Sequence, residues 1–135
     1  MKMMRILALD VDMMKRLVYA GLDCSDATLE WWHSSAKGLY GLVFKGVKNP
    51  GDGELIPAYT LEDIMERLPR SVEDRYQLLV CRADDKWCVQ YTLIAYNCVE
   101  VKIAKYGITL LGAACQMLLW CIENGYVKTD KNGED

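Results

Sequence analysis

The sequence has one histidine, one phenylalanine, three prolines and no apolar run long enough to cross a bilayer. A membrane-spanning helix needs about 20 apolar residues, and Asp10 and Asp12 interrupt the first hydrophobic stretch before it could serve as a signal peptide. Zinc sites need about four grouped cysteine or histidine ligands, but this chain offers only His33 and no Cys-x-x-Cys pair. We therefore expect a cytoplasmic protein with no membrane span, no metal and no cofactor.

Charge of one sign is not in large excess either. The chain has 16 lysines and arginines against 19 acidic residues, and its net charge of −3 argues against nucleic acid or an acidic membrane as partner. Hydrophobic residues make up 52% and charged residues 26%, which is typical of a globular protein. In a reducing compartment the six cysteines are expected to be small buried hydrophobes. They are Cys24, Cys81, Cys88, Cys98, Cys115 and Cys121.

The length of 135 residues fits one domain that can bury its own core. We predict a single α+β domain over residues 1–127 and a flexible polar tail over residues 128–135. Residues 47–54 combine one proline with two glycines, and this turn-forming stretch is the one plausible internal boundary.

Hydrophobic periodicity and capping residues predict three helices. Asp10 can cap a helix that ends near Ala20, with an apolar stripe that includes Met14 and Val18. Thr60 begins a second helix that ends near Leu68, and Asp63 completes its capping box. The third helix starts at Thr109 or Leu110, ends near Asn124 and is followed by Gly125.

The strands are predicted to pair antiparallel and form one sheet, with two strand pairs and a possible fifth strand. A hairpin with Asp84 and Asp85 at its tip sets Val80 opposite Val89, Leu78 opposite Tyr91, Tyr76 opposite Leu93 and Cys81 opposite Cys88, which gives one continuous apolar face. Pro57 favours an edge position for its segment. The predicted strands are 28–32, 39–45, 76–82, 87–93 and 99–103, and residues 55–58 are expected to form a short extended segment.

The last helix is unusually apolar, because Gln116 is its only polar side chain between Leu110 and Ile122. A helix of this kind must be covered on most of its circumference, and it is too short to span a membrane. We expect it to be largely buried, either as the core helix of a monomer or as the seam of a homodimer.

The second half of the chain resembles a group of small uncharacterised proteins encoded by phages, prophages and mobile elements of gut bacteria. The resemblance lies in Ile56–Leu61 before a helix that ends Leu68–Pro69, in Trp87 and Tyr91 on the second hairpin strand, and in a closing helix that ends Leu119–Tyr126. It covers about residues 55–127 and implies no activity and no functional residues.

The strongest candidate for a binding surface is the region of Trp31, Trp32, His33, Lys37 and Tyr40. Adjacent residues of a strand point to opposite faces, so both tryptophans are buried only if the sheet is covered on both sides. An exposed tryptophan often marks an interface. We therefore predict a non-catalytic accessory protein of phage or mobile-element type that binds an unknown protein partner through an apolar and aromatic surface.

Two alternatives remain open for the same region. A small enzyme or ligand-binding protein would need a pocket near Trp32, His33 and Tyr40, in which His33 meets a carboxylate. A weak binder of single-stranded nucleic acid would use residues 31–51, where lysines alternate with aromatic residues. The paired acids elsewhere each have a local reason, as helix starts, hairpin tips or loops, and no phosphate-binding loop is present.

Overall fold

The computed structural model describes residues 8–33, 40–46, 53–95 and 97–129. Within these ranges it confirms the α+β class with three helices, but the strands form two antiparallel sheets rather than one. The elements in chain order are α2 (Val11–Tyr19), β1 (Leu29–His33), β2 (Tyr40–Phe44), β3 (Glu54–Ala58), α3 (Leu61–Arg67), β4 (Ser71–Val72), β5 (Tyr76–Ala83), β6 (Lys86–Ala95), β7 (Cys98–Gly107) and α4 (Leu110–Glu123).

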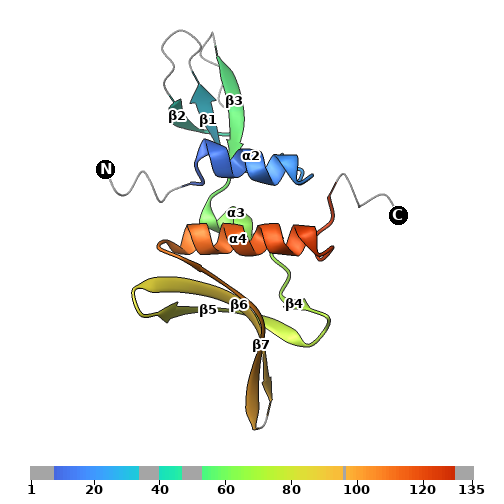
Figure 1. The fold of residues 1–135 in the computed structure, drawn as a ribbon. Helices are drawn as coiled ribbons and strands as arrows, with labels where there is room; N and C mark the ends of the chain where they lie inside the picture. The colour runs from blue at the N-terminus through green and yellow to red at the C-terminus, as the bar shows by residue number, and fades with distance from the viewer. Residues whose placement is uncertain (1–7, 34–39, 47–52, 96, 130–135) are drawn as a thin grey trace.

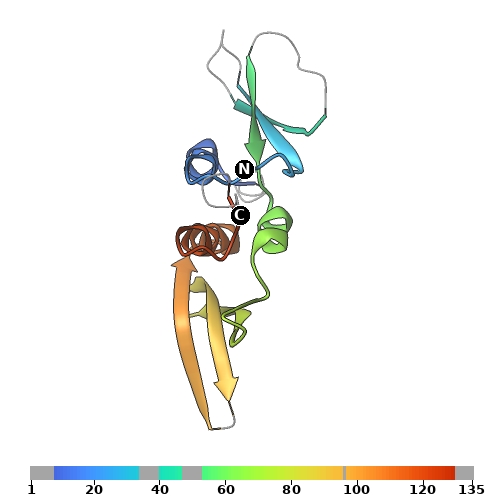
Figure 2. The ribbon, with the colours of Figure 1, turned by 90° about the vertical axis from the view of Figure 1, so that its right-hand side faces the viewer.

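The helices lie between the two sheets (Figures 1 and 2). The three-stranded sheet has the order β2-β1-β3, so β3 is an edge strand, as Pro57 predicted. The four-stranded sheet has the order β4-β5-β6-β7 and packs against α4 through β6 and β7. The far end of the β6–β7 hairpin projects away from the helices (Figure 1). Within the described part of the chain, no helix is long and apolar enough to cross a bilayer.

Helix α2 forms where the capping pattern predicted it. The Asp10 carboxylate accepts the Met13 N–H at 2.8 Å, and Gly21 follows the helix with a φ of 104° that favours glycine. Met14 and Leu17 are fully buried, whereas Val18 is 48% exposed. The apolar stripe is therefore narrower than predicted, because only its central residues meet the core.

Helix α3 has the predicted capping box, in which Thr60 accepts the Asp63 N–H at 3.1 Å and Asp63 accepts the Thr60 N–H at 2.9 Å. The same carboxylate accepts the Thr28 N–H at 3.0 Å and the Thr28 hydroxyl at 2.7 Å. Burial acts to raise the pKa of Asp63, but these hydrogen bonds outweigh it and the pKa lies below its usual value. Asp63 therefore ties the start of β1 to α3.

The β5–β6 hairpin has the predicted register, with Val80 opposite Val89 and Cys81 opposite Cys88. The β5–β6 ladder ends at Gln77 and does not include the expected pair of Tyr76 with Leu93; Tyr76 pairs instead with the short strand β4, which was not predicted.

Strand β7 is ten residues long, about twice the predicted length of 99–103. It contains a β-bulge, because Tyr91 pairs with Ile103 and Thr92 with Val101, so that Lys102 is the extra residue.

The prediction of a largely buried last helix is confirmed. Thr109 caps α4 by accepting the Gly112 N–H at 3.0 Å, and the helix packs against β6, β7 and α3. Because the chain itself covers this helix, α4 is not available as the seam of a homodimer. Its buried residues are Leu111, Ala113, Ala114, Cys115, Met117, Leu118, Leu119, Cys121 and Ile122.

One hydrophobic core joins residues on both sides of the predicted boundary at 47–54, from Leu9 to Val127. Residues 47–52 of that stretch lie outside the described residues, as do residues 130–135 of the predicted tail. At the start of the tail, Lys128 is exposed but Thr129 is buried.

Candidate interaction surface

Trp31 lies in the central strand β1 and is half-buried. Its indole N–H donates to the Leu9 carbonyl at 2.7 Å, and its ring packs against a small core under the three-stranded sheet. Because this tryptophan is held by a hydrogen bond and by packing, its position has a structural explanation.

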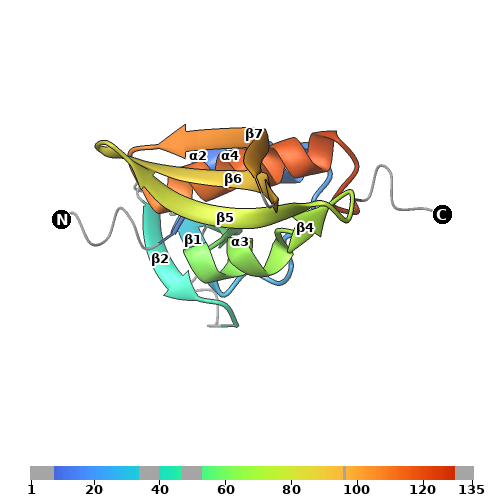
Figure 3. The ribbon, with the colours of Figure 1, turned by 90° about the horizontal axis from the view of Figure 1, so that it is seen from below.

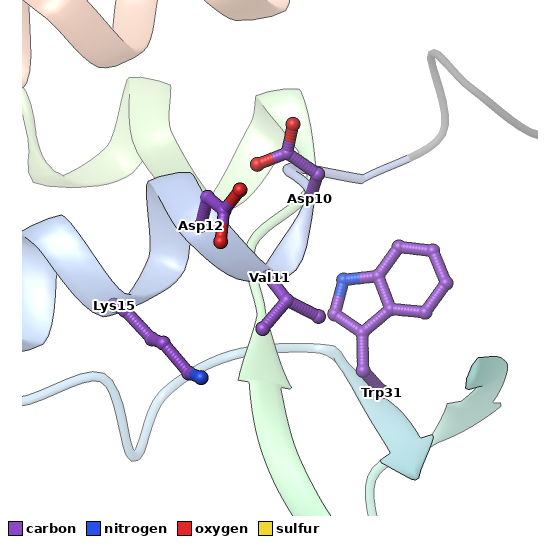
Figure 4. A pocket seen from close by; sticks show the side chains of 5 residues that line it. All are labelled: Asp10, Val11, Asp12, Lys15 and Trp31. Carbon is purple, nitrogen blue, oxygen red and sulfur yellow. The ribbon is translucent and has the colours of Figure 1, made fainter. Parts of the chain in front are cut away.

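The exposed side of Trp31 borders a hollow of about 360 Å³ between β1 and the start of α2 (Figure 4). Asp10, Val11, Asp12 and Lys15 line the rest of this hollow. The Asp10 carboxylate already caps α2, and no group of three or more possible metal ligands occurs among the described residues. This hollow therefore shows a helix terminus beside an aromatic ring and no nucleophile paired with a base.

Trp32 is also half-buried, so neither tryptophan is exposed. Gly41 lies opposite Trp32 on β2, and a Cβ built on this glycine would lie 3.8 Å from the ring. At Gly53, which has a φ of 130°, a Cβ would lie 2.2 Å from the His33 carbonyl oxygen and 2.9 Å from the Trp32 indole nitrogen. The ring of Trp32 is thus closely bordered by backbone at both glycines.

The remaining predicted site residues are only partly described. His33 ends β1, with Tyr40 and Glu54 as its cross-strand partners, and it lines none of three hollows found on the described surface. Tyr40 is placed by its backbone in β2, and Lys37 lies outside the described residues. The structure therefore brings Trp31, Trp32 and His33 together only as neighbours along one strand.

Three buried cysteines, Cys24, Cys115 and Cys121, are poorly suited to act as nucleophiles. Burial raises the pKa of Cys24 and of Cys121 to about 11 and that of Cys115 to about 12, which keeps these thiols protonated and unreactive at neutral pH. Cys88 is buried as well, so the prediction of buried cysteines is right for four of them, but Cys81 is half-buried and Cys98 is exposed.

The most distinctive surface lies on the four-stranded sheet and was not predicted. Val89 and Tyr91 of β6 are fully buried toward the helices, so the alternate residues of β6 and their cross-strand partners point away from the helices. We call these positions the outer face; Figure 3 shows the ribbon of this sheet from the side away from the helices. They are Gln77, Leu79, Cys81 and Ala83 on β5, Lys86, Cys88, Gln90, Thr92 and Ile94 on β6, and Val99, Val101, Ala104 and Tyr106 on β7.

The outer face is largely apolar, and Lys86, beside the β5–β6 turn, is the one charged residue among its thirteen positions. Cys88 and Thr92 are buried within it, and the other positions are half-buried or exposed. Five of its members are large hydrophobic residues with substantial exposure: Leu79 at 38%, Ile94 at 68%, Val99 at 64%, Val101 at 47% and Tyr106 at 49%. Together these five residues expose roughly 500 Å² of surface, backbone atoms included, which lies in the range of the largest apolar patches on monomeric proteins.

Charged residues occupy the opposite side of the projecting hairpin and form ion pairs there. Glu100 accepts the Tyr76 hydroxyl at 3.1 Å and lies 3.8 Å from the Arg75 guanidinium. The Lys102 ammonium lies 3.3 Å from the Glu73 carboxylate, which also accepts the Tyr126 hydroxyl at 2.6 Å. The hairpin therefore turns its charges toward the body of the protein and its apolar residues toward solvent.

The bulge explains why the sequence did not reveal this face. The alternation Val99-Glu100-Val101-Lys102-Ile103 predicts three apolar residues on one buried side. The extra residue Lys102 changes the phase of the alternation, so that Ile103 pairs with buried Tyr91 while Val99 and Val101 point outward. A bulge leaves no simple signal in a single sequence.

No family model, no curated protein and no solved structure matches this chain.

Proposed function

We propose that this chain is a non-catalytic interaction protein that binds a protein partner through the outer face of its four-stranded sheet. The observation that carries the proposal is a face with five exposed large hydrophobic residues and only one charged residue, Lys86, beside the β5–β6 turn. Single exposed hydrophobic residues are ordinary, whereas a connected patch of this size commonly marks an interaction site. The partner surface is expected to be apolar too, because a charge buried against the five hydrophobic residues would find no counter-charge beside them.

The size of the patch is compatible with specific but moderate binding. Removing roughly 500 Å² of apolar surface from water contributes about 12 kcal/mol before the entropy of association is subtracted. That cost is of similar size, so the net affinity depends on how well the partner fits the face.

The phage or mobile-element origin suggested by the resemblance over residues 55–127 belongs to this proposal as a hypothesis, and so does the expected cytoplasmic location. The two alternatives for residues 31–51 remain predictions, because Lys37, Lys48 and the side chain of Tyr40 lie outside the described part of the chain.

The test compares three immobilised proteins: the wild type, Val101→Lys and the matched control Phe44→Lys. Phe44 is 71% exposed and belongs to the other sheet, so the control adds the same charge away from the outer face. We expect proteins from the native host that bind the wild type and Phe44→Lys but not Val101→Lys. Thermal unfolding checks that each variant is folded, and equal retention of the same proteins by Val101→Lys would contradict the proposal.

A further inference from the structure

We infer that the occupant of the outer face is a second copy of this chain, packed outer face to outer face about a two-fold axis. This inference rests on the proposed function and names the partner of the same surface. In a two-fold interface each copy contributes the same patch, so the patch must be complementary to itself.

Charge is the first argument for self-association. The whole chain carries a net charge of −3, so two copies repel each other weakly at long range. The outer face has a single charged residue, Lys86 beside the β5–β6 turn, and the nearby Glu100 and Lys102 are directed toward partners within the same chain. The five large hydrophobic residues of this face are therefore complementary to those of a second copy without any matching of signs.

The available area is the second argument. Two copies would bury roughly 1,000 Å² from the five large hydrophobic residues alone, which reaches the lower limit of specific protein interfaces. Gln77 would add polar area at the margin, and Gln90 would add some in the centre, between Leu79 and Ala104. Interfaces at this lower limit are typical of weak or transient complexes, so dimer formation should depend on concentration.

The bulge in β7 favours packing of two copies through the faces of their sheets over pairing through their edge strands. Strand β7 is an edge strand, and a long regular edge could pair with the β7 of another copy. At Lys102, however, the bulge interrupts the regular spacing of β7, and bulges and edge lysines both oppose strand pairing. Face-to-face packing needs no continuous ladder of hydrogen bonds and is therefore the arrangement that the sheet favours.

Sedimentation equilibrium of the full chain, up to about 200 µM, tests the inference. We expect a reversible monomer–dimer equilibrium in the wild type. Val101→Lys and, as a second outer-face variant, Val99→Lys should each raise the dissociation constant at least tenfold, because the two-fold axis places two added charges in one apolar interface. Phe44→Lys and the edge variant Lys102→Ala should leave the constant within about twofold of the wild type.

The outcomes separate this inference from the proposed function. A wild type that stays monomeric at the highest concentration overturns the dimer, as does a dimer that Val101→Lys leaves intact. If the wild type is monomeric but captures a host protein in a manner that Val101→Lys abolishes, the inference fails and the proposed function stands. If neither self-association nor capture responds to outer-face variants, both fail.

Discussion

Asp63 offers the sharpest test of how the start of β1 is tied to α3. This residue is 6% exposed, and its carboxylate accepts three hydrogen bonds, two from Thr28 and one from the Thr60 N–H. Replacing it with alanine removes both the tie to β1 and half of the capping box of α3. Asp63→Asn keeps the size of the side chain but removes the charge.

The hydrogen bonds set the expected magnitudes. Hydrogen bonds to a charged group contribute about 1.5–3 kcal/mol each, less the desolvation of the carboxylate, so we expect Asp63→Ala to lower the free energy of unfolding by about 2–4 kcal/mol. Asp63→Asn should lose about 1–2 kcal/mol, because its amide oxygen can still accept the two N–H groups while the Thr28 hydroxyl turns to accept from the amide. The matched control Glu62→Gln, an exposed acid in the same turn, should stay within about 0.5 kcal/mol.

The assay is urea unfolding of the four proteins over a pH series. The pKa of Asp63 is lowered in the folded state, so its stabilisation is complete above the unfolded-state pKa of about 3.9 and is lost as the pH falls through the lower folded-state pKa. The difference between the wild type and Asp63→Asn should therefore be largest at neutral pH and should shrink below about pH 4. A cost of Asp63→Ala below about 1 kcal/mol, or a difference that does not change with pH, would refute the reasoning.

Three further predictions concern the core, a tight turn and the hairpin thiols. Leu118→Ala should lower the free energy of unfolding by about 2–5 kcal/mol because Leu118 is fully buried, and a loss below about 1 kcal/mol in urea unfolding would contradict its place in the core. Gly53→Ala should destabilise the protein by about 1–3 kcal/mol, since the added Cβ meets the His33 carbonyl at a positive φ; an unchanged melting temperature would contradict this. The cross-strand thiols Cys81 and Cys88 should form a disulfide with the oxidant diamide, faster as the pH rises because burial raises the pKa of Cys88. Mass spectrometry would show the loss of two hydrogens, and no such loss, or the same loss in Cys81→Ser, would argue against it.

Most of the fold could be predicted because its signals are local. The Asp10 and Thr60 caps, the glycine after α2 and the β5–β6 register each depend on residues within a few positions of one another. The division of the strands into two sheets could not be predicted in the same way. It depends on which faces the apolar helix α4 covers, and that is decided by packing across the whole chain.

The candidate site was harder to predict because it depends on the phase of one strand. Trp31 and Trp32 attracted attention by residue type, yet a hydrogen bond to Leu9 and close packing against backbone glycines explain their positions. The outer face became visible only when the bulge at Lys102 showed which side of β7 Val99 and Val101 occupy. Composition alone cannot distinguish an apolar residue that faces the core from one that faces solvent.

The position of α4 in the chain has a consequence for biosynthesis. Residues of α2, α3 and the β5–β6 hairpin share one core with α4, so their apolar sides have no complete cover until residues 110–123 have been translated. At about 5–20 residues per second, the growing polypeptide would carry this incomplete core for several seconds while still attached to the ribosome. Folding is therefore expected to finish late, and the nascent chain is a natural client for chaperones that shield hydrophobic segments.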